Sequence, residues 1–157
     1  MKLDVIPIGR DRPDLVRGLA RLRWLEWNQW QPWRDLQWWV DTTAAETGPV
    51  GVPVTFVATT GGEVLGGMGV VATERPEYAD RGPWVVGVVV RADRRGQGVG
   101  TILMSGVVGW AREAGLPHLW VSTGGRAVTF YRRCGFRPVE STVLPTGESV
   151  DVLKRSV

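Results

Sequence analysis

The chain has 157 residues, a formal net charge of +3, one cysteine (Cys134) and one histidine (His118). This length suits one compact domain that buries a core without help from a metal or a disulfide. A single cysteine excludes an internal disulfide framework, and a single histidine excludes a Cys/His zinc cluster. We therefore expect one domain over residues 1–157 and no bound metal.

Charge and hydropathy narrow the class of partner. Of the 19 basic residues only Lys2 and Lys154 are lysines, and acidic residues are interspersed among the arginines. No run of five like charges occurs, which argues against a nucleic-acid partner. The first five residues lack the apolar core of a signal peptide, and no apolar stretch approaches the roughly 18 residues that cross a bilayer. We expect a soluble cytoplasmic protein without a membrane partner.

The first third of the chain combines one strand with helices. Residues 3–8 read as a strand, and Pro13 marks the start of a helix with apolar residues at intervals of three and four. The helical pattern continues to Val40 and breaks near Pro32, because the residue before a proline avoids the helical region. Residues 42–53, with several glycines and prolines, predict a loop.

Three strands follow, at 54–59, 64–72 and 84–90. The first two meet at Gly61-Gly62, a typical two-residue hairpin turn. The third is a nearly continuous β-branched run, as expected of a central strand covered on both faces. A polar loop over residues 74–83 precedes it.

The second half begins with a change of period at Val99, which predicts an amphipathic helix that ends at Gly115. A strand at 118–123 and a short helix at 127–134 come next, and the last two strands are expected at 136–144 and 149–154. This order predicts a mixed α/β domain.

The segment between the strand at 84–90 and the next helix carries the clearest chemical signal. Gly96, Gly98 and Gly100 stand at alternate positions, beside Arg94 and Arg95. Small residues let a ligand approach the backbone, and the free N–H groups of a helix N-terminus favour phosphate. The spacing is neither that of a P-loop nor the dinucleotide pattern G-x-G-x-x-G. Taken alone, the glycines favour a strand-to-helix turn that binds nothing.

Two segments resemble the GNAT superfamily of acetyl-CoA-dependent N-acetyltransferases. Residues 95–100 match the pattern Arg/Gln-x-x-Gly-x-Gly/Ala, and residues 127–136 are similar to the pattern A-x-x-F-Y-x-x-x-G-F. The resemblance covers residues 55–154. It implies a mixed, mostly antiparallel sheet of about seven strands with flanking helices.

The resemblance also implies a binding mode for acetyl-CoA. The backbone of the strand at 84–90 pairs with the pantetheine arm, and main-chain N–H groups of the glycine-rich loop hold the pyrophosphate. Many members carry an asparagine before the second segment, whereas this chain has Thr123-Gly124-Gly125-Arg126, so Arg126 either replaces it or is a solvated charge. The implied cofactor-binding residues are Val88, Val89, Val90, Arg95, Gly96, Gln97, Gly98, Val99, Gly100, Thr101 and Arg126.

Acid–base residues follow from the same resemblance. Tyr131 occupies the position of the general acid that protonates the departing thiolate, whose conjugate acid has a pKa of about 8.5. Its helical spacing is also that of a core aromatic residue. The glutamate that some members use as general base falls on Gly82 here. The nearest candidates are Glu74, Glu77 and Asp80, which act as base, bind the amine or are solvated loop charges.

Tryptophan is concentrated in one segment. Six of the nine tryptophans lie at positions 24, 27, 30, 33, 38 and 39. They predict either an acceptor-binding site, in which Glu26, Trp27 and Trp30 hold an ammonium group through charge and cation–π attraction, or a core or homodimer contact.

The predicted function is direct transfer of an acetyl group from acetyl-CoA to a primary amine of a small molecule, aminoglycoside-like or polyamine-like. A protein or peptide N-terminus is an alternative acceptor, and a non-catalytic acyl-CoA-binding regulatory module is an alternative class. Cys134 lies on an apolar helix face, so we expect a buried thiol and no covalent relay.

Overall fold

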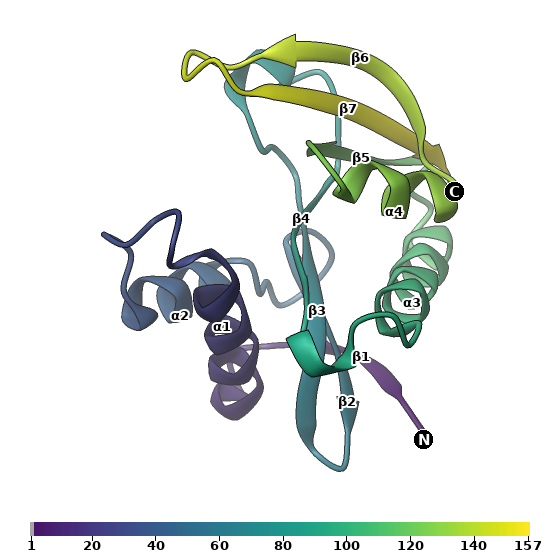
Figure 1. Ribbon diagram of the computed structural model, residues 1–157. Coiled ribbons are helices and arrows are strands. Elements are labelled where there is room, and N and C mark those ends of the chain that lie inside the picture. Colours follow the sequence, from purple (N-terminus) through teal and green to yellow (C-terminus); the bar gives the residue numbers. More distant parts are fainter. Residues whose placement is uncertain (1) are drawn as a thin grey trace.

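The computed structural model describes residues 2–157, which form a seven-stranded sheet with α1 and α2 on one face and α3 and α4 on the other (Figure 1). The strand order is β1-β2-β3-β4-β5-β7-β6, and every neighbouring pair is antiparallel except β4 and β5. The predicted fold class is confirmed. The elements are β1 (Asp4–Ile8), α1 (Pro13–Trp27), α2 (Leu36–Ala45), β2 (Val54–Thr60), β3 (Glu63–Val71), β4 (Trp84–Val90), α3 (Val99–Glu113), β5 (His118–Thr123), α4 (Ala127–Arg133), β6 (Arg137–Val143) and β7 (Ser149–Ser156), with short 3₁₀ turns η1 (Pro76–Tyr78) and η2 (Ala92–Arg94).

The predicted bounds of β4 and β5 are confirmed, whereas the loop predicted at 42–53 starts too early. Helix α2 continues to Ala45, because the glycines and prolines of this segment begin only at Gly48. The predicted break near Pro32 is confirmed, since residues 28–35 connect the two helices. Asp35 begins α2 by accepting a hydrogen bond from the Trp38 N–H at 2.8 Å.

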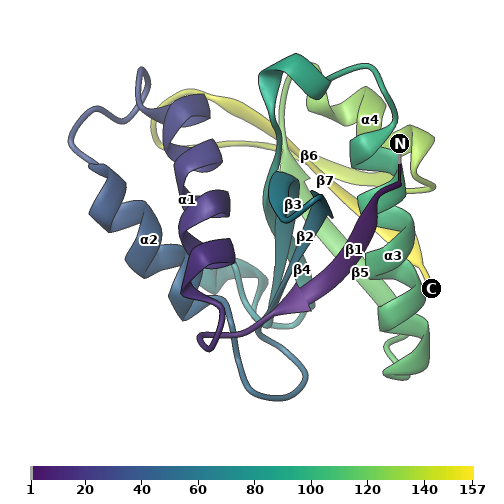
Figure 2. The same cartoon turned by 90° about the horizontal axis from the view of Figure 1, so that it is seen from below.

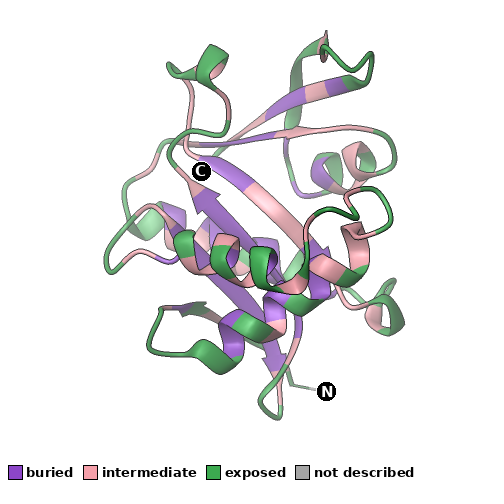
Figure 3. Ribbon diagram, turned by 90° about the vertical axis from the view of Figure 1, so that its left-hand side faces the viewer, coloured by how far each residue is buried: buried purple, intermediate pink, exposed green. Residues whose placement is uncertain are grey.

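Apolar periodicity places a core on each face of the sheet, seen as purple stripes in Figure 3. Leu103, Val107 and Ala111 recur at intervals of four on α3 and are fully buried against β2, β3 and β5. On the other face, Leu15 and Leu19 of α1 cover the inner strands. Burying each such leucine contributes about 1.5–3 kcal/mol, so the helices are held mainly by these stripes.

A third cluster lies over β4, β5 and β7, where no helix covers the sheet. Leu119 and Val121 of β5 face α3, so Trp120 between them faces the opposite side. Trp84 packs against Trp120 with ring centroids 5.8 Å apart, and Tyr78 of the β3–β4 loop stacks on Trp84 at 5.7 Å. The β3–β4 loop therefore covers this part of the sheet, just as α1 covers the part formed by the inner strands.

The centre of the sheet opens between β4 and β5. Two register pairs, Gly67 with Val89 and Gly69 with Val86, show that β4 carries one extra residue, and Gly87 there has a φ of +60°. Within the described residues, β4 and β5 pair at a single register position, Trp84 with Trp120. Beyond it the two strands diverge, and Figure 2 shows the split sheet with α1 and α3 on either side. In residues 2–157 no helix is both long and apolar enough to span a bilayer.

Candidate active site

A groove of about 540 Å³ lies along the second half of β4, beyond the point where this strand diverges from β5. It collects residues from four separate parts of the chain: the end of α1, the second half of β4, the glycine-rich loop and α4. They are Glu26, Val88, Val89, Val90, Arg95, Gly100, Arg126, Ala127, Phe130 and Tyr131. The structure thus brings together several predicted cofactor-binding residues and Tyr131.

The glycine-rich loop has the backbone shape of an anion site. Gly96 and Gly98 have φ of +75° and +83°, a region that other residues rarely adopt, and a Cβ on either would meet no atom within 4 Å. Gly98 is the residue that begins α3, whose first N–H groups have no partner within the helix. An exposed, uncrowded loop with free N–H groups fits the pyrophosphate of a CoA thioester.

Arg95 is tied across the groove. Its Nε donates to the carbonyl oxygen of Val90 at 3.2 Å, and its guanidinium forms an ion pair with Glu26 of α1. The ion pair between Arg95 and Glu26 holds Glu26 at the edge of this groove. Arg126 also lines the groove and is exposed, so the two arginines supply positive charge at its edges.

Three other predicted cofactor-binding side chains lie elsewhere. Gln97 donates to the carbonyl oxygen of Asp93 at 3.2 Å, and Val99 is buried in the core. Thr101 lines a separate hollow between α3 and the end of α4. Any contribution of Gln97 and Val99 to cofactor binding therefore comes from their main-chain atoms.

Tyr131 both packs in the core and lines the groove. It is 6% exposed, and its ring contacts Phe130 and Phe136 with centroid distances of 5.1 and 5.6 Å. Its pKa is raised well above the ordinary value of a phenol, first by burial, then by the negative charge of Glu74 and then by Cys134. The side chain is therefore a neutral phenol at physiological pH and stands within electrostatic reach of Glu74.

Glu74 titrates near neutrality. The residue is solvent-accessible, but protein atoms crowd its carboxyl group, and this desolvation raises the pKa from 4.5 to about 7 against the opposing effect of Arg75. A carboxylate with this pKa is half ionised at pH 7, which suits a general base.

The other two acidic residues of the loop have surroundings that differ from those of Glu74. Glu77 makes an ion pair with Arg75 at 2.9 Å, and Asp80 is exposed. Two cations stand among them. Arg75 lies 3.5 Å from the hydroxyl of Ser122, and Arg81 forms an ion pair with Glu140 and stacks on Tyr78 and Trp120 at 4.6 and 5.1 Å.

The tryptophan-rich segment divides into packed and exposed rings. Trp27 and Trp39 meet across α1 and α2 at a centroid distance of 5.5 Å, and Trp38 contacts Trp39 at 4.8 Å. Trp30 and Trp33, on the connection between the helices, are 71% and 74% exposed. Of the three residues expected to bind the acceptor, Glu26 lines the groove at the end of β4. Trp27 packs between α1 and α2, and Trp30 is exposed to solvent.

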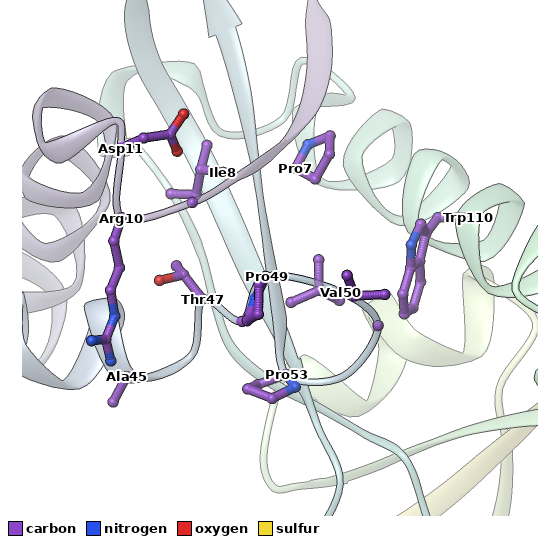
Figure 4. Close-up of a pocket in the computed structure, with 14 residues that line it drawn as sticks. Pro7, Ile8, Arg10, Asp11, Ala45, Thr47, Pro49, Val50, Pro53 and Trp110 are labelled. Carbon is purple, nitrogen blue, oxygen red and sulfur yellow. The ribbon is translucent and has the colours of Figure 1, made fainter.

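A larger hollow, of about 920 Å³, lies away from this groove, between the end of β1, the loop at 47–53 and Trp110 of α3 (Figure 4). Its two charged residues do not converge. The Arg10 guanidinium extends to the carbonyl oxygen of Ala44 at 3.3 Å, while the Asp11 carboxylate points away from it. Without converging polar groups, this hollow is a weaker candidate than the smaller groove.

Arg23 of α1 is a residue that the sequence analysis missed. It is 1% exposed, and its guanidinium forms an ion pair with Glu46 at 3.0 Å beneath the extra residue of β4. Its position four residues after Leu19, on the apolar face of α1, was the available signal, because a charge on such a face is buried with a partner.

Comparison with known protein families identifies the family of this chain. A family model described as the acetyltransferase (GNAT) family matches residues 18–136. The chain belongs to the GNAT family of acetyltransferases. It is therefore a transferase, and acetyl-CoA is the acyl donor of this family. The resemblance identified from residues 95–100 and 127–136 is confirmed.

Solved structures agree with this GNAT assignment. An aminoglycoside 6'-N-acetyltransferase complexed with coenzyme A matches with a TM-score of 0.80 and 14% identity, over 98% of this chain and 96% of that one. An aminoglycoside 6'-N-acetyltransferase from Enterococcus faecium matches with a TM-score of 0.79 and 16% identity, over 98% and 96%. A putative streptothricin acetyltransferase from Bacillus anthracis str. Ames, in complex with acetyl coenzyme A, matches with a TM-score of 0.62 and 18% identity, over 72% and 67%. At these identities the similarity shows a shared fold. No curated protein sequence matches the chain significantly.

Proposed function

We propose that this GNAT acetyltransferase binds acetyl-CoA in the groove between β4 and β5 and transfers the acetyl group directly to a primary amine of a small molecule. The residues present fit such a donor. The loop from Gly96 to Gly100 offers N–H groups to the pyrophosphate, Arg95 and Arg126 add positive charge, and the diverging edge of β4 offers backbone groups to the pantetheine amides.

The observation that carries the proposal is the electrostatic coupling of a neutral phenol that lines the groove, Tyr131, to a carboxyl group of pKa about 7, Glu74. The nitrogen of a neutral amine attacks the thioester carbonyl carbon, and the carboxylate of Glu74 takes the proton that the nitrogen loses, directly or through one water. The C–S bond then breaks, and Tyr131 gives its hydroxyl proton to the departing thiolate. The products are an amide and CoA thiol, and the proton on Glu74 returns to tyrosinate through solvent.

The two groups work in sequence because their charges are coupled. While Glu74 is ionised, its charge raises the pKa of Tyr131 and keeps the phenol protonated. When Glu74 takes the amine proton, this repulsion disappears, and Tyr131 becomes a stronger acid as the thiolate leaves. The order of events therefore favours proton donation after nucleophilic attack.

A small-molecule acceptor, aminoglycoside-like or polyamine-like, is supported by two of the structural neighbours, whose names specify aminoglycoside 6'-N-acetylation. The acceptor class is open to a direct test. A panel containing an aminoglycoside, a polyamine and a peptide with a free N-terminus distinguishes the acceptor classes, with CoA thiol release and product mass as readouts.

Tyr131→Phe is the decisive variant. It is expected to lower kcat by about 100-fold, within the range typical of general acid–base catalysis, while the affinity for CoA stays unchanged. Tyr78→Phe is the matched control, because it removes the hydroxyl of the chain's other tyrosine. Binding of acetyl-CoA without turnover of any amine would contradict the enzymatic proposal and favour a regulatory acyl-CoA-binding module.

A further inference from the structure

The guanidinium of Arg23 connects helices α1 and α2 to β4, the strand that lines the groove. Its Nε donates to the carbonyl oxygen of Gly87 at 3.1 Å, and its Nη1 donates to Thr43 Oγ1 and Glu46 Oε1, both at 3.0 Å. Thr43 lies in α2, Glu46 directly follows it, and Gly87 is the residue with positive φ in β4. One buried cation therefore joins α1, α2 and β4.

Two strand glycines make room for this ion pair. A Cβ on Gly87 would lie 2.6 Å from Arg23 Nη2, and a Cβ on Gly69 would lie 2.7 Å from Glu46 Oε1. Glycine within a strand normally weakens it, and a glycine retained there marks a close approach of another group. The register shift between β3 and β4 spans the same residues. The ion pair and the irregularity of β4 thus form one local structure.

This arrangement is not the one that stability alone favours. Arg23 Nη2 is buried without a hydrogen-bond partner among residues 2–157, and an unsatisfied buried donor is costly. Replacing a buried ion pair by apolar residues is often neutral or stabilising. The charge of Arg23 is therefore expected to act on the peptide group of Gly87, to which Arg23 is hydrogen-bonded.

That peptide group belongs to the groove. A trans peptide is planar, with its C=O and N–H pointing in opposite directions. Since the Gly87 carbonyl points to Arg23, the Val88 N–H in the same peptide unit points away from Arg23, and Val88 lines the groove. A cation bonded to the carbonyl polarises the peptide and makes its N–H a stronger donor.

We propose that Arg23 is a positioning residue for acetyl transfer, which fixes and polarises the Gly87–Val88 peptide so that the Val88 N–H donates to the thioester carbonyl oxygen. This inference rests on the proposed binding of acetyl-CoA in the groove. The negative charge that develops on that oxygen during attack strengthens the hydrogen bond, so the contribution appears mainly in kcat.

The test separates positioning from stability with a double variant. Arg23→Met alone leaves the Glu46 carboxylate half-buried without its partner and can fail to fold for that reason. Arg23→Met/Glu46→Leu removes both charges, so the fold is expected to survive while the bond to Gly87 is lost. Arg23→Lys keeps the charge and is expected to restore part of kcat. Arg17→Met is the control for an exposed arginine of the same helix.

The double variant is expected to lose about 10- to 100-fold in kcat, with the KM for acetyl-CoA changed less than threefold. In the protein without ligand, the ¹⁵N–¹H signal of Val88 is expected to shift. Either full kcat or an unchanged Val88 signal would overturn the role of Arg23. The NMR arm needs no cofactor, so it decides on Arg23 even if wild-type protein fails to bind acetyl-CoA, a result that would refute the proposed function instead.

Discussion

The glycine-rich loop before α3 and the tryptophan-rich connection before α2 are both exposed segments beside the start of a helix, but they present different chemistry. The loop from Gly96 to Gly100 exposes backbone, with positive φ and free space at Gly96 and Gly98. The connection at 28–35 exposes two indole rings, Trp30 and Trp33. Backbone recognition requires glycine at set positions, whereas side-chain recognition leaves no such spacing in a sequence.

The difference explains why the donor side of a GNAT enzyme is easier to infer than its acceptor side. In the proposed function, a single local loop binds the pyrophosphate of the donor. The residues proposed for the acceptor side, Glu74 in the β3–β4 loop and Trp30 in the α1–α2 connection, are distant in sequence. Variants on each side test whether the two functions are separate.

The largest expected effect lies on the acceptor side, at Glu74. In wild-type enzyme kcat/KM is expected to rise with pH and reach half its maximum near pH 7, because only ionised Glu74 accepts the amine proton. Glu74→Gln is expected to remove this dependence and lower kcat/KM at pH 8 by about 100-fold. Glu77→Gln, which removes a carboxylate already paired with Arg75, is the control.

The stability of the Glu74→Gln variant checks the same pKa by another route. Because the folded-state pKa of Glu74 lies above its ordinary 4.5, folding favours the protonated form, and the stability that it contributes below pH 4.5 is lost as pH rises toward 7. Glu74→Gln is therefore expected to unfold at a higher temperature than wild type at pH 8 and at the same temperature at pH 4. Equal unfolding temperatures at both values would contradict the raised pKa.

The next largest effect is on the donor side. Gly98→Leu is expected to weaken CoA binding by about 30-fold. The leucine side chain fills the space above the loop, and its positive φ destabilises the loop conformation by about 1–2 kcal/mol. Calorimetry with CoA measures the change. Gly109→Ala, at an open position on the same helix, is the control. Unchanged CoA affinity in Gly98→Leu would remove this loop from the donor site.

A smaller effect is expected from the exposed tryptophans. Trp30→Ala is expected to leave CoA affinity unchanged and to alter the free energy of unfolding by less than about 0.5 kcal/mol, because the ring is 71% exposed. If the ring contacts a cationic acceptor, KM for the amine rises about threefold, the size of an exposed cation–π contact. Trp84→Ala, at a fully buried ring, is expected to cost about 3–5 kcal/mol in the same unfolding measurement.

The smallest effect is expected where the two sides meet. Glu26→Gln removes the ion pair with Arg95, but both side chains are substantially exposed, at 38% and 51%. Exposed pairs contribute little, so CoA affinity is expected to change less than about twofold, upward if Arg95 is freed to contact the donor. A tenfold loss of affinity, measured at low and high salt, would show that this pair organises the groove.

How much of this could be predicted follows the same division. β4, β5 and the two GNAT segments are readable because continuous β-branched runs, helical periods and glycine spacing are local patterns. The end of α2 was misplaced because Thr42 and Thr43 are weak helix formers, although Ala44 and Ala45 after them favour a helix. The coupling of Glu74 to Tyr131 was not predictable, since the 56 residues between them must fold before the two side chains approach. Arg23 was missed because its partners, Glu46 and Gly87, are 23 and 64 residues away in the sequence.

The single register pair between β4 and β5 also affects how the two parts of the sheet unfold locally. Few main-chain hydrogen bonds connect the part of the sheet formed by β1–β4 to that formed by β5–β7, so each is expected to exchange its amide hydrogens as a separate cooperative unit. In the proposed mode of donor binding, the pantetheine arm would lie between them and take the place of the absent strand contacts. Donor binding is then expected to slow exchange on both units together, which would make the cosubstrate a temporary part of the sheet.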